Sequence, residues 1–264
     1  MDDRENMPHD GEGARQTDGG ARPPSIVRRE PALNLPAVIV ALIALFIAVQ
    51  LLRGMLSEDA EYRLLLDFAF LPLRYCMAPS LAASQLPDGL WPAFAGPVTH
   101  MFLHDGWMHL VVNSLWLAAF GAPVARRVGP WRFLALSMSA AAGGAALYLA
   151  FHCKEPALLL GASGAISGLM GAAIRLIYAD NLPLQMSFHR DLSRVTPLSV
   201  AQCFFYSRPR AFILIWMGVN LAFGLAGMGA QMAAIAWEAH TGGFLTGLFA
   251  FGLFDRRISP TGAA

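Results

Sequence analysis

Long apolar segments alternate with short polar connections along the chain, a pattern typical of a membrane protein with several helical spans. The first apolar segment covers residues 35–52. Five more lie at about 99–121, 131–151, 157–178, 210–228 and 231–253. Most are close to the roughly 20 residues that a helix needs to cross a bilayer. The pattern therefore predicts an all-α polytopic membrane protein with six transmembrane helices.

The segments outside these spans differ in composition. Residues 1–35 are rich in Asp, Glu, Arg, Gly and Pro, which predicts a disordered cytoplasmic N-terminal tail. The long connection 53–98 carries mixed charges and apolar patches too short to span, so we expect it at the interface or re-entering the bilayer. We therefore predict a six-span core over 36–254 and a short cytoplasmic C-terminal tail over 255–264.

The composition supports the membrane assignment. Hydrophobic residues make up 56% of the 264 residues and charged residues 14%, against about 45–50% and about 25% in soluble domains. The mean hydropathy is +0.48, and a net charge of +1 lacks the basic footprint of a nucleic-acid binder. These values exclude a single soluble domain, a disordered chain and a collagen-like chain.

The chain has only 3 cysteines, which is an odd number and too few for a disulfide framework, so none is expected. Cys76 and Cys153 could meet on one side of the membrane, but isolated thiols are the favoured interpretation.

Positive residues predict the orientation, because short cytoplasmic loops of membrane proteins carry an excess of Lys and Arg. With the N-terminus inside, the inside connections contain Arg126, Arg127, Arg132, Arg190, Arg194, Arg208, Arg210, Arg256 and Arg257. Lys154 is the only Lys or Arg in the short outside connections. We therefore expect a multi-pass cell membrane protein with both termini cytoplasmic. The Ala- and Arg-rich composition favours a bacterial cytoplasmic membrane.

Polar residues inside three spans fall at a similar depth. The second span carries His104, His109 and Asn113, the fourth carries Ser163, and the sixth carries His240. At about 1.5 Å per residue, these positions lie in the outer half of the membrane or near its midplane. Polar side chains in hydrocarbon are costly and usually mark function or packing.

Glycine stripes predict which spans touch. His240, Gly243 and Gly247 recur on one face of the sixth span, and the fourth span carries a stripe at Gly164, Gly168 and Gly171. Small residues at this spacing let helix backbones approach closely in lipid. Contact between the fourth and sixth spans would bring Ser163 within hydrogen-bond reach of His240, which a serine nucleophile and its base require.

These motifs together resemble those of the rhomboid intramembrane serine proteases. GASG at 161–164 is similar to the family's Gly-x-Ser-Gly nucleophile motif, and AHTGG at 239–243 to its catalytic-histidine helix. HDGWMHLVVN at 104–113 resembles its His-x4-His-x3-Asn pattern in the second span. The three motifs occur in the family's order, within about 35–254, which implies a six-transmembrane-helix rhomboid-like bundle.

The resemblance implies a role for each matched residue. Ser163 would be the nucleophile and His240 the general base. Asn113, His109 and the backbone amide of Ser163 would form the oxyanion hole. Supporting roles would fall to Gly161, His104, Gly243 and Gly247. No metal or cofactor is expected. Glu238 lies on a different helix face from His240, so we predict a Ser–His dyad and not a triad.

Two positions depart from the family pattern. Ala95 and Gly96 stand where many members have a Trp-Arg pair in the first loop, so that loop anchor is absent or replaced. Ser167 stands four positions after the nucleophile, where an aromatic residue commonly stacks under the catalytic histidine. The orientation of His240 must therefore come from another residue.

The sequence predicts an intramembrane endopeptidase whose partners are single-pass or polytopic membrane-protein substrates in the lipid bilayer, with no nucleic acid. Resemblance to the family assigns the lateral gate to the fifth span, which contains Phe212, Trp216, Asn220 and Phe223. One alternative is a catalytically weak or inactive rhomboid-like protein that binds transmembrane clients. Another is a small transporter or channel, although that class favours buried charges on several spans, which are missing here.

Overall fold

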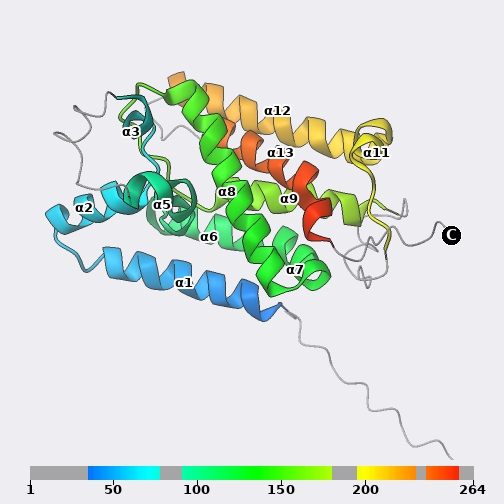
Figure 1. Ribbon diagram of the computed structural model, residues 1–264, viewed down its shortest axis with the longest axis horizontal. Coiled ribbons are helices and arrows are strands. Elements are labelled where there is room, and N and C mark those ends of the chain that lie inside the picture. Colours follow the sequence, from blue (N-terminus) through cyan, green and yellow to red (C-terminus); the bar gives the residue numbers. More distant parts are fainter. Residues whose placement is uncertain (1–34, 78–90, 180–194, 230–235, 256–264) are drawn as a thin grey trace, which may run out of the picture. The chain divides into compact units, whose positions relative to one another are not determined.

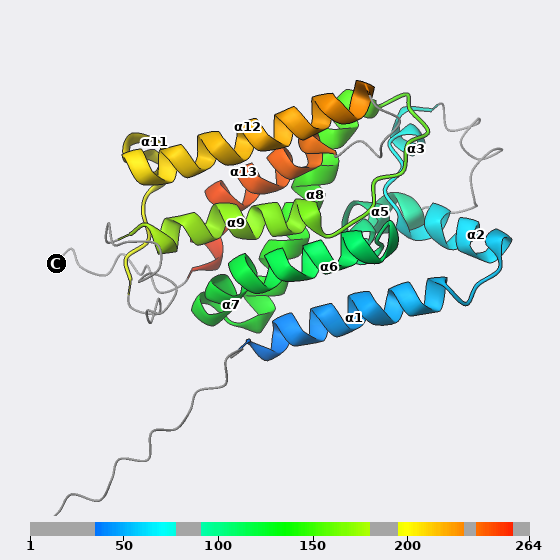
Figure 2. The ribbon, with the colours of Figure 1, turned by 180° about the vertical axis from the view of Figure 1, so that it is seen from behind.

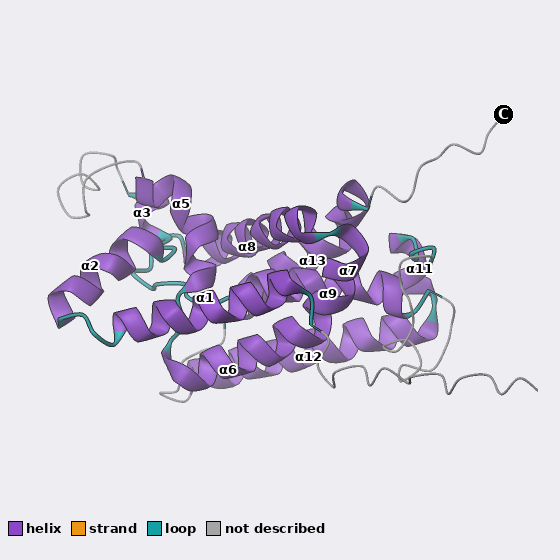
Figure 3. Ribbon diagram, turned by 90° about the horizontal axis from the view of Figure 1, so that it is seen from below, coloured by secondary structure: helices purple, strands orange, loops and turns teal. Residues whose placement is uncertain are grey.

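The structure is a computed structural model, and it describes residues 35–77, 91–179, 195–229 and 236–255 (Figure 1). Every regular element in these ranges is helical (Figure 3), and the only extended pairing among them is one isolated bridge. The predicted N-terminal tail lies outside the described residues up to residue 34, and so does the C-terminal tail beyond residue 255.

Helices occur where the apolar segments predict them. They are α1 (Ala37–Arg53), α6 (Gly106–Trp116) continued by η2 (Leu117–Gly121) and α7 (Ala122–Val128), α8 (Pro130–His152), α9 (Ser163–Ile177), α12 (Ser207–Gly229) and α13 (Trp237–Phe254). Among the described residues, 106–128, 130–152 and 207–226 have the length and apolar composition to cross a bilayer. The protein is therefore an all-α membrane protein. That it has six transmembrane spans stays a prediction.

α9 lies at the centre of the core and packs against α13 and α8, which also pack directly against each other (Figure 2). Every residue of this helix from Gly164 to Ile177 is buried. A helix that is apolar on all sides is expected inside a bundle and not at its surface. α12 is peripheral, since side chains such as Leu214 and Ile215 are 64% and 67% exposed. It contacts the bundle mainly along α13 and through Phe212, whose ring packs against Phe120 of η2.

The glycine stripes bring α9 and α13 into close contact, which confirms the packing predicted from the sequence. A Cβ atom on Gly243 would collide with the backbone carbonyl of Gly164, and one on Gly247 with that of Gly168. The face of α13 toward α8 is equally tight, at Gly143, Gly144 and Gly242. Backbone contact of this kind fixes the relative position of the two helices that carry Ser163 and His240.

The described parts of the connection between α1 and α6, residues 54–77 and 91–105, contain α2 (Glu58–Phe68), α3 (Leu73–Cys76), α5 (Trp91–Thr99) and η1 (His100–Phe102). Arg53 links its parts, because its guanidinium pairs with Glu61 at 2.7 Å and donates to the His104 carbonyl at 2.6 Å. Phe70 and Leu159 form the isolated bridge, in which the Leu159 N–H donates to the Phe70 carbonyl at 2.9 Å. The connection is thereby attached to the segment that precedes α9.

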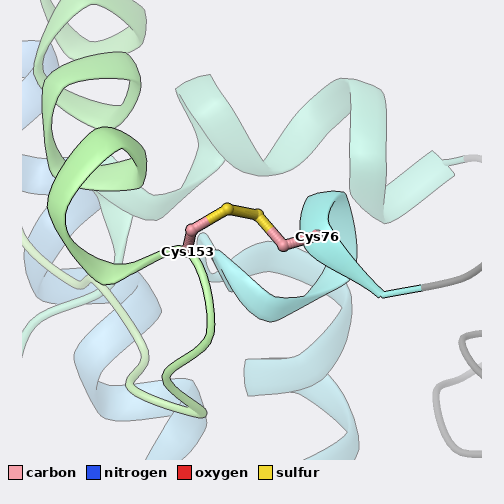
Figure 4. Close-up of a disulfide and its surroundings, with 2 residues drawn as sticks. All are labelled: Cys76 and Cys153. Carbon is pink, nitrogen blue, oxygen red and sulfur yellow. A yellow bond between two sulfur atoms is a disulfide. The ribbon is translucent and has the colours of Figure 1, made fainter.

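A disulfide joins Cys76, the last residue of α3, to Cys153, just after α8 (Figure 4). The interpretation of these cysteines as isolated thiols was therefore wrong. Their Cα atoms are 5.7 Å apart although 77 positions separate them in sequence, and the nearby Phe70–Leu159 bridge brings the two segments together. Cys203 of α11 (Val200–Phe205) is free, and burial raises the pKa of its thiol to about 11.

Three predicted boundaries need correction. The second span begins at Gly106 and not near 99, and it continues to Val128, so Arg127 lies in its last turn. There Arg127 is buried and pairs with Asp255 at 3.0 Å. The fourth span begins at Ser163 and not near 157, because the segment before it is non-helical. The sixth helix begins at Trp237 and not near 231.

Candidate active site

Ser163 is the first residue of α9, so it lies at the start of the helix and not several residues inside a helix that begins near residue 157. The 15-residue helix is roughly 22 Å long, short of the roughly 30 Å hydrocarbon core. The chain reaches it through the non-helical residues 153–162. Gly161, with a φ of 111°, makes the final turn, and its N–H donates to the His100 carbonyl at 3.0 Å.

The four residues predicted as catalytic or as oxyanion donors line one cavity of about 780 Å³. Ser163 comes from α9, His240 from α13, and His109 and Asn113 from α6. Apolar side chains form much of the remaining wall, including Val112, Trp116, Phe212, Ile215, Trp216 and Val219. An apolar cavity with a few convergent polar groups is the usual form of an enzyme site.

His109 and Asn113 lie one turn apart on α6 and present hydrogen-bond donors to the cavity. Asp105 donates its backbone N–H to His109 Nδ1 at 3.3 Å, so Nε2 carries the hydrogen in the neutral ring. Asn113 is 3% exposed, and its Nδ2 has no hydrogen-bond partner among the described residues. Such a buried, unpaired donor is costly unless a ligand satisfies it.

Gly161 lies directly beside these two donors. A Cβ atom at this position would be 2.8 Å from His109 Nε2 and 3.6 Å from Asn113 Nδ2. The absence of a side chain thus keeps the space in front of both donors open, two residues before Ser163. An oxygen in that space would accept hydrogen bonds from both side chains.

His240 is half-buried on the first turn of α13. Its Nδ1 lies 2.6 Å from Asn220 Oδ1 of α12. Asn220 also donates from Nδ2 to the Trp216 carbonyl at 2.9 Å. Glu238 is directed elsewhere, since its Oε1 lies 3.1 Å from His152 Nε2. The side chain bonded to His240 is therefore an amide and not a carboxylate.

His104 does not lie within the second span, because it precedes α6. Its ring packs against Phe46 and against the edge of His109, with ring centroids 4.9 Å and 5.4 Å apart. Both ring nitrogens are buried without a hydrogen-bond partner among the described residues. His104 thus contacts the site through the ring of His109.

The two departures from the family pattern have visible consequences. Ser167 is buried and lines the cavity, so no aromatic ring of α9 lies at that position. A Cβ atom on Gly96 would be 3.0 Å from the Ala69 carbonyl, and Ala95 is buried, so α5 packs tightly without large side chains there. Elsewhere in the same connection, Arg53 of α1 contacts Glu61 of α2 and the His104 carbonyl.

Asn220 is the site residue that the sequence analysis did not assign to His240. It was considered only as a polar residue of the fifth span. A polar side chain in an apolar span usually pairs with a group on a neighbouring helix. This rule is the signal in the sequence that indicates a partner for Asn220. Among the described residues, no group of His, Cys, Asp or Glu is arranged to hold a metal ion.

Comparisons with known proteins place the chain in a family. Residues 93–257 match the Rhomboid domain family. RHOMBOID-like protein 6, mitochondrial, of Arabidopsis thaliana is 28% identical over 80% of this chain and 65% of its own length. RHOMBOID-like protein 1 of the same plant is 26% identical over 87% of this chain and 57% of its own length.

A bacterial protein is similar over a shorter region. Rhomboid protease GluP of Bacillus subtilis (strain 168) is 30% identical over 63% of this chain and 27% of its own length. The chain thus spans less than two thirds of the length of these relatives. The family match covers more than half of the chain, including all three motifs. The chain belongs to the rhomboid family.

Proposed function

We propose that this protein is an intramembrane serine endopeptidase that cleaves transmembrane segments of partner proteins with a Ser163–His240 dyad. The observation that carries the proposal is the convergence of the two residues with the unpaired Asn113 amide in one cavity. The name of the bacterial relative, a rhomboid protease, supports the same activity.

The residues of the cavity suit acyl transfer. Ser163 Oγ attacks the carbonyl carbon of the scissile bond, and its proton passes to His240 Nε2. The carbonyl oxygen becomes an oxyanion and accepts hydrogen bonds from Asn113 Nδ2, His109 Nε2–H and the Ser163 backbone N–H.

The remaining steps return the site to its starting state. The C–N bond breaks and His240 gives its proton to the leaving amine, which leaves the acyl group on Ser163. Water then hydrolyses the ester, with His240 again as the base. Gly161 keeps the oxyanion position open in both halves of the reaction.

The substrates would be single-pass or polytopic membrane proteins, because rhomboid proteins act within the bilayer. A peptide bond inside a helix is shielded by the helix's own hydrogen bonds, so the substrate must unwind locally. The peripheral position of α12 and its contribution to the cavity wall support its assignment as the lateral gate.

We further propose a bacterial cytoplasmic membrane location with both termini in the cytoplasm. Disulfides persist in oxidising compartments and are rare in the cytosol. The Cys76–Cys153 bond lies in the two connections that the positive-residue pattern assigns to the outside, which supports this orientation.

Fluorophosphonate labelling tests the activity without a known substrate. The full chain, purified in detergent, is treated with an alkyl fluorophosphonate beside Ser163→Ala and His240→Ala. We expect covalent label on the wild type and its loss in both variants, because Ser163 displaces fluoride only when His240 accepts its proton. Label lost in Ser167→Ala but retained in Ser163→Ala would mean that the neighbouring cavity serine is the nucleophile. An unlabelled wild type would favour an inactive, client-binding protein.

A further inference from the structure

The base of a Ser–His pair needs a defined tautomer as well as a defined position. The nitrogen that faces the serine must carry a lone pair, so the hydrogen of the neutral ring must be on the other nitrogen. In a Ser-His-Asp triad the carboxylate ensures this arrangement. Among the residues that the structure describes, no carboxylate is hydrogen-bonded to His240, and Ser167 provides no ring for it to stack on.

Asn220 provides the missing acceptor. Its Oδ1 lies 2.6 Å from His240 Nδ1. An amide oxygen accepts but cannot donate, so His240 Nδ1 must be the donor. The hydrogen of the neutral ring is then on Nδ1, and the lone pair is on Nε2.

The amide of Asn220 is itself held in one orientation. Its Nδ2 donates to the Trp216 carbonyl one turn earlier at 2.9 Å, which leaves Oδ1 to face His240. Asn220 is 9% exposed, so little water competes for either group. A hydrogen bond whose acceptor is buried in this way is electrostatically stronger than the same bond in water.

The contact between α12 and α13 reinforces this bond on both sides. One turn toward the α12 N-terminus, Trp216 stacks on Phe244 with centroids 4.8 Å apart and planes 20° from parallel. One turn toward the α12 C-terminus, Gly224 packs closely on Trp237, since a Cβ atom on Gly224 would be 2.8 Å from Trp237 Cγ. The Asn220–His240 bond is thus the middle contact of three between two antiparallel helices.

We propose that Asn220 is a positioning residue that holds His240 in the Nδ1–H tautomer with Nε2 free to accept the Ser163 proton. This inference deepens the proposed function and rests on it for the role of Ser163. Since Asn220 belongs to α12, the alignment of the base depends on the position of the helix proposed as the gate.

Two substitutions separate the acceptor from the shape of the side chain. Asn220→Leu keeps the branched shape and the number of side-chain heavy atoms and removes the acceptor, whereas Asn220→Asp keeps an oxygen that accepts from Nδ1–H. Gly218→Ala is the control on the same helix, because no atom of the described part of the chain lies within 4 Å of a Cβ atom there. All variants are made in the full chain, and thermal unfolding in detergent checks that each is folded.

The first readout is the rate of reaction with an alkyl fluorophosphonate. We expect Asn220→Leu to react about tenfold to a thousandfold more slowly than the wild type, since a wrong tautomer removes most general-base assistance. Asn220→Asp should recover much of that rate, and Gly218→Ala should react like the wild type.

The second readout is the tautomer itself, which a merely structural role would not change. Nitrogen NMR of protein labelled with ¹⁵N-histidine distinguishes the protonated ring nitrogen, and His240→Ala assigns the signal. We expect Nδ1–H in the wild type and in Asn220→Asp, and loss of that preference in Asn220→Leu.

The outcomes separate this inference from the proposed function. An Asn220→Leu variant that reacts within about twofold of the wild type and keeps the Nδ1–H form would overturn the inference, although the protease proposal would stand. A slower reaction with an unchanged tautomer would also overturn it, because Asn220 would then act only through packing. The wild-type protein could instead fail to react with the fluorophosphonate while its His240 tautomer still depends on Asn220. That result would refute the protease proposal and retain the positioning role of Asn220.

Discussion

At the scale of single residues, the proposed oxyanion donors His109 and Asn113 depend on the absence of a side chain beside them. Gly161 has a φ of 111°, and a side chain there would meet His109 and Asn113. A glycine at this position therefore satisfies two independent requirements, a left-handed backbone and an open space. The motif Gly-x-Ser-Gly was recognised in the sequence, but the contact that makes its first glycine necessary comes from α6, some fifty residues earlier.

Gly161→Ala tests the second requirement, with Gly129→Ala as its control. Both glycines have positive φ, of 111° and 82°, so each alanine should cost about 1–3 kcal/mol of stability through backbone strain. Only the Cβ at 161 meets the donors, since nothing lies within 4 Å at 129. We expect the fluorophosphonate rate to fall about 10²-fold or more in Gly161→Ala alone. Equal rates in the two variants would contradict this account of Gly161.

At the scale of helices, the site is assembled by close backbone contact between α9 and α13. The sequence predicted this contact because glycines at this spacing in an apolar span are typical of tightly packed membrane helices. The ends of the same helices could not be predicted as well. Apolar character continues through 157–162, so hydropathy does not mark where α9 begins, and residues 99–105 mix apolar with polar side chains without marking the start of α6. The turns at Gly161 and Gly106 mark these starts instead, through positive φ.

Gly247→Ala should separate α9 from α13. Its Cβ would collide with the Gly168 carbonyl, and overpacking against backbone typically costs about 1–3 kcal/mol. We expect a fall of several degrees in the thermal midpoint in detergent, with a slower fluorophosphonate reaction as Ser163 moves from His240.

Gly218→Ala is the matched control, since nothing lies within 4 Å of its Cβ. Alanine is the better helix former by about 1 kcal/mol, so this variant should unfold at the wild-type temperature or slightly above. A Gly247→Ala protein as stable as the Gly218→Ala protein would argue against backbone contact between the two helices.

The gate assignment of α12 is tested by tying it to α6. Val112 and Val219 line the cavity from these two helices, so a short bifunctional maleimide is expected to link Val112→Cys to Val219→Cys. Cys203 should not interfere, because its thiol is buried and has a raised pKa. The linked protein should stop cleaving a model single-pass membrane protein, while each singly modified variant continues. Unchanged cleavage by the linked protein would exclude entry between these helices.

At the scale of the whole chain, long-range covalent and ionic links join segments that no local pattern relates. The Cys76–Cys153 disulfide attaches the α1–α6 connection to the end of α8, and Arg127 of α7 pairs with Asp255 just after α13. Hydropathy and motif order were sufficient to predict an all-α membrane fold and its family. They could not pair two cysteines 77 residues apart or assign Asn220 to His240, because both contacts depend on the packing of helices.

Replacing both disulfide cysteines by serine should therefore have two consequences. The bond closes a loop of 77 residues, and such cross-links typically contribute about 2–4 kcal/mol by restricting the unfolded chain. The Cys76→Ser/Cys153→Ser variant should unfold several degrees below the wild type. Dithiothreitol should lower the unfolding temperature of the wild type by a similar amount and leave that of the variant unchanged.

The same cysteines report the orientation of the membrane protein. In intact cells, a membrane-impermeant maleimide should label the wild type only after mild reduction, and should not label the serine variant, because Cys203 is buried. Labelling that requires permeabilised cells would place these connections in the cytosol, where a stable disulfide is not expected. It would reverse the proposed orientation and, with it, the side from which water reaches Ser163.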